Sequence, residues 1–159
     1  MDSLAELYVE ELKDLWSAET QIVKALPKMI TAATSPGLKA GFRKHLGESR
    51  EHVRRLERIM KELGKSPRGK KCVGMEGLLK EGAELIKERP EPEVLDAGLI
   101  SAAQHVEHYE MAGYGTVRTW ARLLGHRGQA RLLQQTLNEE GATDKALTKL
   151  SERINVAAE

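Results

Sequence analysis

The sequence predicts an all-α fold in which four long helices form a bundle. Leu, Ala, Glu, Lys and Arg dominate, while aromatic residues make up only 4% of the chain. Runs of β-branched residues, which strands favour, are absent. Apolar residues recur instead at the three- and four-residue intervals of amphipathic helices. These observations together favour helices throughout.

Length and charge narrow the class of protein. A chain of 159 residues can bury a full core without disulfides, so residues 1–159 are expected to form a single domain. Lys plus Arg number 25 and Asp plus Glu number 24, which gives no overall attraction to nucleic acid or anionic membranes. The N-terminal stretch is acidic and amphipathic, without the basic start or the apolar run expected of a signal peptide or membrane span, and the single Cys72 fits a reducing compartment. The expected location is the cytoplasm.

The first helix is expected to begin after Ser3, which forms a capping box with Glu6, and to extend to about Ala33. Pro27 lies inside it and should bend it. The second helix should begin with Ser35 as N-cap and Pro36 at its first position. It is expected to end near Leu63, before Gly64.

A long connection follows. It comprises the basic loop "KSPRGKKCVG", a short helix from Met75 to about Glu88, and the segment "RPEPE". The third long helix should extend from about Glu93 to Leu124 and end at Gly125, and the fourth from about Gln129 to the last residues. Two tight helical hairpins joined by a long crossover that contains a short helix are typical of a ferritin-like four-helix bundle.

Acidic residues interrupt the apolar face of the third long helix. In "AAQHVEHYEMAGYG" (102–115), Glu107 and Glu110 lie on the same side as the apolar residues, whereas Tyr109 projects away from it. Burying an unpaired carboxylate costs several kcal/mol, so such residues must be protonated, paired or bound to metal.

The other long helices also direct polar residues inward. On the helical wheel these are Glu19 on the first helix, His45, Ser49 and His52 with Glu48 beside them on the second, and Glu140 and Asp144 on the fourth. A faint repeat between the two hairpins favours Glu139 in place of Glu140, whereas the helical period favours Glu140. Converging carboxylates repel one another unless cations lie between them. We therefore expect a dinuclear metal site with candidate ligands Glu19, Glu48, His52, Glu107, Glu110, Glu140 and Asp144, and with His45 as the alternative to His52.

Five segments resemble the YciE/YciF family of ferritin-like proteins. They are "ELKDLWSAETQIVKALPKM" (11–29), "HLGESREHVRRLE" (45–57), "KCVGMEGL" (71–78), "AAQHVEHYEMAGYGT" (102–116) and "QTLNEEGATDKALTKL" (135–150). The resemblance implies a ferritin-like fold, a dinuclear metal centre, an association with bacterial stress, and homodimers. By position it supports Glu19, Glu48, Glu107, Glu110 and Glu140 as ligands.

Three functional hypotheses follow. The first is a di-iron protein that oxidises Fe(II) or reduces peroxide or O₂. The second is a di-manganese catalase-like enzyme, because carboxylate-rich ligands also suit manganese. The third is a non-catalytic scaffold in which the inward acids form hydrogen-bond networks with His45, His52, Arg and Tyr residues. Nucleic acid is not expected as a partner, because Glu57 and Glu62 interrupt the basic stretch from Arg54 to Lys71.

Overall fold

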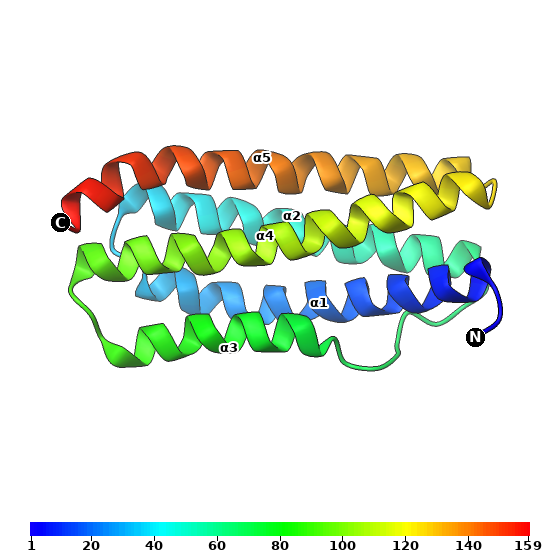
Figure 1. Ribbon diagram of the computed structural model, residues 1–159, viewed down its shortest axis with the longest axis horizontal. Coiled ribbons are helices and arrows are strands. Elements are labelled where there is room, and N and C mark those ends of the chain that lie inside the picture. Colours follow the sequence, from blue (N-terminus) through cyan, green and yellow to red (C-terminus); the bar gives the residue numbers. More distant parts are fainter.

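The computed structural model describes residues 1–159 and contains five helices without strands (Figure 1). Four long helices lie side by side, and the shorter α3 packs on the outside against α1 and α4 (Figure 1). The helices are α1 (Leu4–Ala32), α2 (Pro36–Glu62), α3 (Val73–Glu88), α4 (Pro92–Leu123) and α5 (Arg127–Ala157). The chain is therefore all-helical, with hairpins α1–α2 and α4–α5 joined by the crossover that contains α3.

Local sequence signals set the helix ends. Ser3 Oγ accepts a hydrogen bond from the Glu6 amide at 3.2 Å, and Ser35 Oγ accepts one from the Leu38 amide at 3.4 Å. Gly64 and Gly125, with φ of +65° and +80°, follow α2 and α4 in the left-handed conformation that glycine adopts readily. The expected helix ends agree with the observed ones within about two residues.

The buried positions follow a heptad spacing on each long helix. On α2 the heptad series is Leu38, Phe42, His45, Ser49, His52, Leu56 and Ile59, with Met60 also buried, and on α5 it is Leu133, Thr136, Glu140, Thr143 and Leu147, with Gln129 and Ala130 also buried before it. These intervals alternate between three and four residues, which is the spacing of helices that pack at a small angle and coil around one another. The seam between helices therefore has a period of about 3.5 residues, not 3.6.

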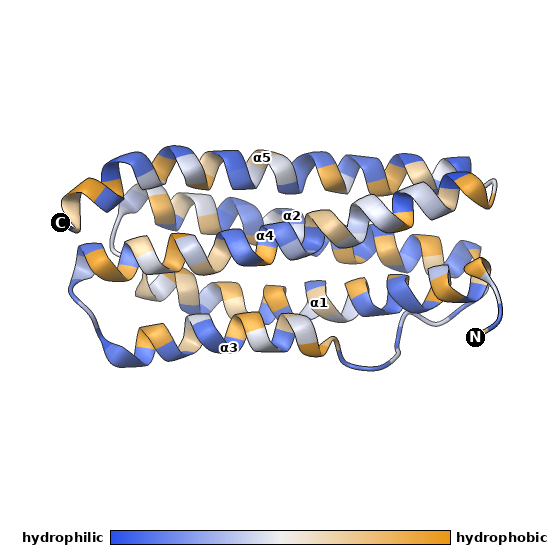
Figure 2. Cartoon of the chain, in the orientation of Figure 1, coloured by the Kyte–Doolittle hydropathy of each residue, from blue (hydrophilic) through white to orange (hydrophobic).

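Two apolar clusters fill the bundle, one on each side of a polar layer. The first joins residues such as Ile22, Phe42 and Leu99, and the second joins residues such as Leu15, Leu56 and Val117. Between them the chain buries glutamate and histidine side chains, and hydrophilic residues accordingly interrupt apolar ones in the middle of α4 (Figure 2). The core is thus divided by the layer that carries the candidate site.

Hydrogen bonds of Cys72, the residue before α3, connect the start of this helix to α1. The Cys72 amide donates to Ser17 Oγ at 2.9 Å, its carbonyl accepts from Gln21 Nε2 at 3.1 Å, and its Sγ accepts from the Met75 amide at 3.5 Å. Cys72 is therefore the N-cap of α3, and the helix begins at Val73, two residues before the expected start.

The expectation that Tyr109 points away from the core was wrong, because α3 covers that face of α4. Tyr109 is half-buried; its hydroxyl donates to Asp14 Oδ2 at 3.2 Å and lies 3.0 Å from Cys72 Sγ. The crossover passes so close that a Cβ at Gly74 would lie 2.8 Å from the Tyr109 ring. The tyrosine thus links the crossover to α1 and α4.

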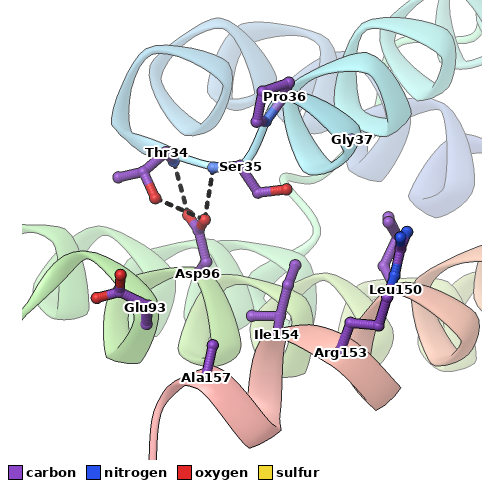
Figure 3. A pocket seen from close by; sticks show the side chains of 10 residues that line it. All are labelled: Thr34, Ser35, Pro36, Gly37, Glu93, Asp96, Leu150, Arg153, Ile154 and Ala157. Atoms are coloured by element: carbon purple, nitrogen blue, oxygen red, sulfur yellow. Dashed lines mark hydrogen bonds between the residues drawn. The ribbon is translucent and has the colours of Figure 1, made fainter.

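Asp96 connects the two hairpins at the end of the bundle where α1 turns into α2. This carboxylate on α4 is 2% exposed and accepts hydrogen bonds from the Thr34 amide (2.7 Å), the Thr34 hydroxyl (2.7 Å) and the Ser35 amide (2.6 Å). Figure 3 shows it reaching from α4 to the turn between α1 and α2, at one side of a surface pocket. A side chain from one hairpin therefore satisfies the backbone of the other.

None of the five helices combines the length and the apolar character that a membrane span requires.

We predict that Asp96→Ala lowers the free energy of unfolding by about 2 kcal/mol, because two backbone amides and a hydroxyl would lose their buried, charged acceptor. Urea denaturation followed by circular dichroism measures this loss. The control is Glu93→Ala, an exposed acid beside the same pocket, which should cost less than about 1 kcal/mol. Equal losses in the two variants would contradict the assigned role of Asp96.

Candidate metal centre

Four glutamates from three helices meet in the polar layer. Glu19 on α1, Glu107 and Glu110 on α4, and Glu140 on α5 are each at most 1% exposed. Each occupies a buried seam position of its helix, in line with the apolar residues that form the core further along the same helix. The helix register that buries the apolar core therefore also buries these carboxyl groups.

The ligand-type side chains form two adjacent groups that share one member. His45, Glu107, Glu110 and Glu140 make the first group, and Glu19, His52 and Glu140 make the second; within each, one nitrogen or oxygen of every residue lies within 4.8 Å of the others. Glu140 belongs to both groups, so its carboxylate lies between two positions that could each hold a cation. We call these six residues the buried cluster.

His52 contacts three carboxylates. Its Nδ1 donates to Glu19 Oε1 at 3.0 Å and lies 2.9 Å from Glu140 Oε1, while its Nε2 donates to Glu139 Oε2 at 2.8 Å. Burial disfavours the charged imidazole, but the hydrogen bonds to Glu140 and Glu19 prevail and raise the pKa of His52 to about 11. The imidazolium is thus the one cation inside the layer.

Glu139 lies outside the buried cluster and holds His52 in place. Arg55 donates to both of its carboxylate oxygens, at 2.6 and 3.0 Å, and also to Thr136 Oγ1 at 3.1 Å. Although burial works against its charge, hydrogen bonds from Arg55 and His52 hold the pKa of Glu139 below its usual value. This bidentate pair fixes the Nε2 side of His52 and leaves Nδ1 facing the cluster.

His45 faces the other side of the cluster. Its Nδ1 lies 2.7 Å from Glu107 Oε1, and burial lowers the pKa of the imidazole, against the attraction of Glu140 and Glu19. The sequence left His45 and His52 as alternatives, but the structure brings both into the layer, one in each ligand group.

The surroundings of Glu107 and Glu110 favour their protonated forms. Burial, together with the neighbouring charges of Glu140 and Glu19, raises the pKa of Glu107 to about 12 and that of Glu110 well above its usual value. Glu140 behaves differently: burial opposes its charge, but the proximity of the His52 imidazolium and of Glu107 lowers its pKa. The protein by itself therefore limits the repulsion among the four acids by protonating two of them.

Many polar atoms of the layer lack a well-aligned hydrogen-bond partner, including Glu107 Oε1 and Glu140 Oε1, although these two lie close to His45 and His52. The atoms without such a partner are Glu19 Oε2, His45 Nε2, Ser49 Oγ, both oxygens of Glu107 and of Glu110, and Glu140 Oε1. Leaving such groups unpaired in a core costs about 1–3 kcal/mol each. Carboxylate oxygens and imidazole nitrogens are the atoms that bind divalent transition metals, so the donor set fits two such ions.

Tyr114 adds a hydroxyl to the same layer. It donates to Glu19 Oε1 at 2.6 Å, and burial together with the charges of Glu19 and Glu110 raises its pKa well above the usual value. The ring meets His52 edge-on, with centroids 6.2 Å apart. The hydroxyl therefore keeps its proton and directs it to Glu19.

Two residues expected in the site lie outside it. Glu48 is partly exposed, pairs with Lys44 at 3.0 Å and accepts from Thr143 at 3.3 Å. Asp144 accepts from Gln104 at 3.1 Å and lies 3.2 Å from His108, on the outside of the bundle. Each is one residue from a seam position, so its side chain leaves the interior at an angle and reaches the outside of the bundle. Ser49 and Thr143 occupy those seam positions instead.

The sequence reasoning missed the role of Arg55, which it assigned to a charged surface. The available signal was spacing, since Arg55 follows His52 by three residues and lies on the same side of α2. The choice between Glu139 and Glu140 also has a structural answer: Glu140 lies in the cluster, and Glu139 binds His52 from outside.

Known proteins resemble the chain over its whole length. Protein YciF of Escherichia coli (strain K12) is 42% identical over 161 residues, which cover 100% of this chain and 97% of YciF. The crystal structure of the E. coli stress protein YciF matches with a TM-score of 0.94 and 41% identity, over 97% of this chain and 98% of that one.

Two further structures share the fold. YcfI of Rhodopseudomonas palustris, provisionally described as a structural protein, matches with a TM-score of 0.90 and 42% identity, over 93% of this chain and 94% of that one. A Xanthomonas campestris protein at 21% identity has a TM-score of 0.80, covering 98% of this chain and 95% of that one, and shows the fold alone. Residues 3–158 match the family described as "Domain of unknown function (DUF892)". From this match and the identity with YciF, the chain belongs to the DUF892 family, with YciF as a relative.

Proposed function

We propose that this protein is a ferritin-like dinuclear metal protein of the bacterial stress response, which binds two iron ions and oxidises Fe(II) or reduces peroxide or O₂. We further propose that it acts in the cytoplasm as a homodimer. One observation carries the proposal: four buried carboxyl groups and two histidines converge in two groups that share Glu140. The paired hairpins and long crossover support the ferritin-like assignment.

The negative charge of the buried cluster supports the proposal of two bound cations. Once Glu107 and Glu110 lose their protons and His52 becomes neutral, the four carboxylates of the cluster carry four negative charges, which two divalent ions would balance. The unpaired oxygens of Glu107 and Glu110 would then find partners. A cluster that is costly on its own thus becomes favourable with metal.

The residues divide between the two positions. Glu19 and His52 would hold one ion, His45, Glu107 and Glu110 the other, and Glu140 both. His52 would bind through Nδ1, because Glu139 accepts from Nε2 and Arg55 orients Glu139. When bound, a pair of iron ions would supply the redox chemistry that protein side chains lack.

Tyr114 and the two apolar clusters determine which protons and how much water can reach the site. The Tyr114 hydroxyl oxygen lies 2.6 Å from Glu19 Oε1, so its proton is held beside that carboxylate and could be donated to a substrate there. The apolar clusters on both sides of the layer exclude water from the bundle interior.

Manganese is the alternative metal, and one observation favours it: carboxylates outnumber imidazoles four to two in the cluster, and carboxylate ligands suit Mn(II). The same fold would then support a catalase-like reaction with peroxide.

A scaffold without metal is the alternative from another class. His52 already pairs with three carboxylates, and YcfI is described as a structural protein. Such a network could hold the layer together with protons alone. The two predictions below separate this alternative from a metal protein.

We predict that untagged protein contains about two iron or manganese ions per chain, and that chelation lowers its melting temperature. Glu140→Gln should lose most of the metal, because it removes the carboxylate common to both positions. Asp144→Asn on the same helix should keep it, because Asp144 lies outside the cluster. Elemental analysis and thermal melts measure both effects. If wild type contains no metal, and if its melting temperature does not change when Fe(II) or Mn(II) is added anaerobically, the metal function is wrong. The scaffold without metal would then be the supported alternative.

We also predict that chelated protein loses stability as pH rises from 7 to 9. The folded state keeps protons on Glu107, whose pKa rises from 4.5 to about 12, and on His52, whose pKa rises from 6.5 to about 11. The unfolded chain releases these protons at lower pH, so each costs about 1.4 kcal/mol of stability per pH unit across this window. Denaturant unfolding at three pH values measures the slope.

The matched control for this slope is Glu107→Gln, which has no proton to retain and should show a shallower decline. Metal-loaded wild type should also decline less, since bound cations replace the protons. A slope that neither metal nor the variant changes would show that other groups cause it.

A further inference from the structure

The hairpin formed by α4 and α5 has a segregated positive charge. Residues 111–138 contain no Asp or Glu, although acidic residues occupy 24 of the 159 positions. The same stretch contains Arg118, Arg122, Arg127 and Arg131. In a chain with nearly balanced charge, this concentration of unopposed arginine is unusual and needs an explanation.

Three of these arginines line one pocket beside the α4–α5 turn. The pocket has a volume of about 420 Å³, and its walls are Arg122, Arg127, Arg131, Gln134 and Ala130. Arg118 extends the pocket, because its Nη1 donates to Gln134 Oε1 at 2.7 Å and holds that amide beside the arginines.

The arginines of the pocket have no carboxylate partners. Arg54, Arg55 and Arg58 on α2 each pair with a glutamate at 2.6 to 3.2 Å, whereas no acidic side chain lines the pocket. The Nε atom of Arg118 is buried and lacks any hydrogen-bond partner. The first turn of α5, which begins at Arg127, has no side-chain cap, so its amides add positive potential at the same end.

We propose that this arginine pocket binds a small compound that carries two or more phosphate groups. Guanidinium groups present paired N–H donors that match phosphate oxygens, and a cluster made of arginine without lysine favours such bidentate contacts. Three lining charges suit an anion of about three negative charges, and the volume lies within the range of about 300–1,000 Å³ for small-molecule sites.

The arrangement favours a compact anion over a nucleic acid. The arginines gather around one concave site at a helical turn, whereas a nucleic-acid backbone needs positive charge along an extended track. The site is also independent of the buried cluster, because it lies beyond the apolar cluster that includes Val117, Ala121 and Leu133.

Calorimetric titration with pyrophosphate at low salt tests the proposal. The test variant combines Arg122→Gln with Arg131→Gln, and both residues are exposed, so folding should be unaffected. The control variant combines Arg43→Gln with Arg50→Gln, which removes the same charge from exposed positions on α2. We expect pyrophosphate to bind wild type and the control alike, orthophosphate to bind more weakly, and the test variant to lose at least about tenfold in affinity.

Three results would overturn the proposal. They are the absence of pyrophosphate binding to wild type, equal losses in the two double variants, and binding of a single-stranded oligonucleotide without binding of pyrophosphate. The last result would identify an extended polyanion surface instead. Any heat from pyrophosphate binding to metal would be common to the two double variants, so the difference between them is separate from the proposed metal function.

Discussion

The structure depends on burying four carboxyl groups in the middle of a helical bundle. Such groups strongly oppose burial, yet Glu19, Glu107, Glu110 and Glu140 lie at seam positions where apolar residues would stabilise the bundle without cost. The protein limits the cost with protons on Glu107 and Glu110 and with the imidazolium of His52. An arrangement that opposes folding in this way needs a functional reason, and the metal ions that we propose would supply one.

The rest of the fold holds this layer rigid. Apolar clusters pack against it from both sides, so a shift of any long helix would disturb core packing as well as the cluster. Asp96 ties α4 to the α1–α2 turn, and Tyr109 ties the crossover to α1. Outside the cluster, Arg55 and Glu139 fix the ring of His52. Residues that bind nothing themselves thus determine how the inner donor atoms are placed.

Charge is distributed unevenly in this nearly neutral chain. Acidic groups gather in the interior, where only a few protons and one imidazolium balance them, and arginine without acid gathers at the α4–α5 turn. Net charge conceals both features, since it sums over the whole chain. The overall balance argues against general binding to polyanions, but it does not describe a local pocket lined by three guanidinium groups.

The sequence by itself determined the helices and the inward direction of the acids, because caps, glycines and apolar periodicity are local properties. Only the tertiary structure decided the membership of the cluster. The rotation of the packed helices brings both His45 and His52 to the cluster and leaves Glu48 and Asp144 outside it. Likewise, the environment of Tyr109 depended on where α3 packs, which no pattern within α4 records. Contacts between helices depend on their relative rotation, and that rotation is fixed only when all their surfaces pack together.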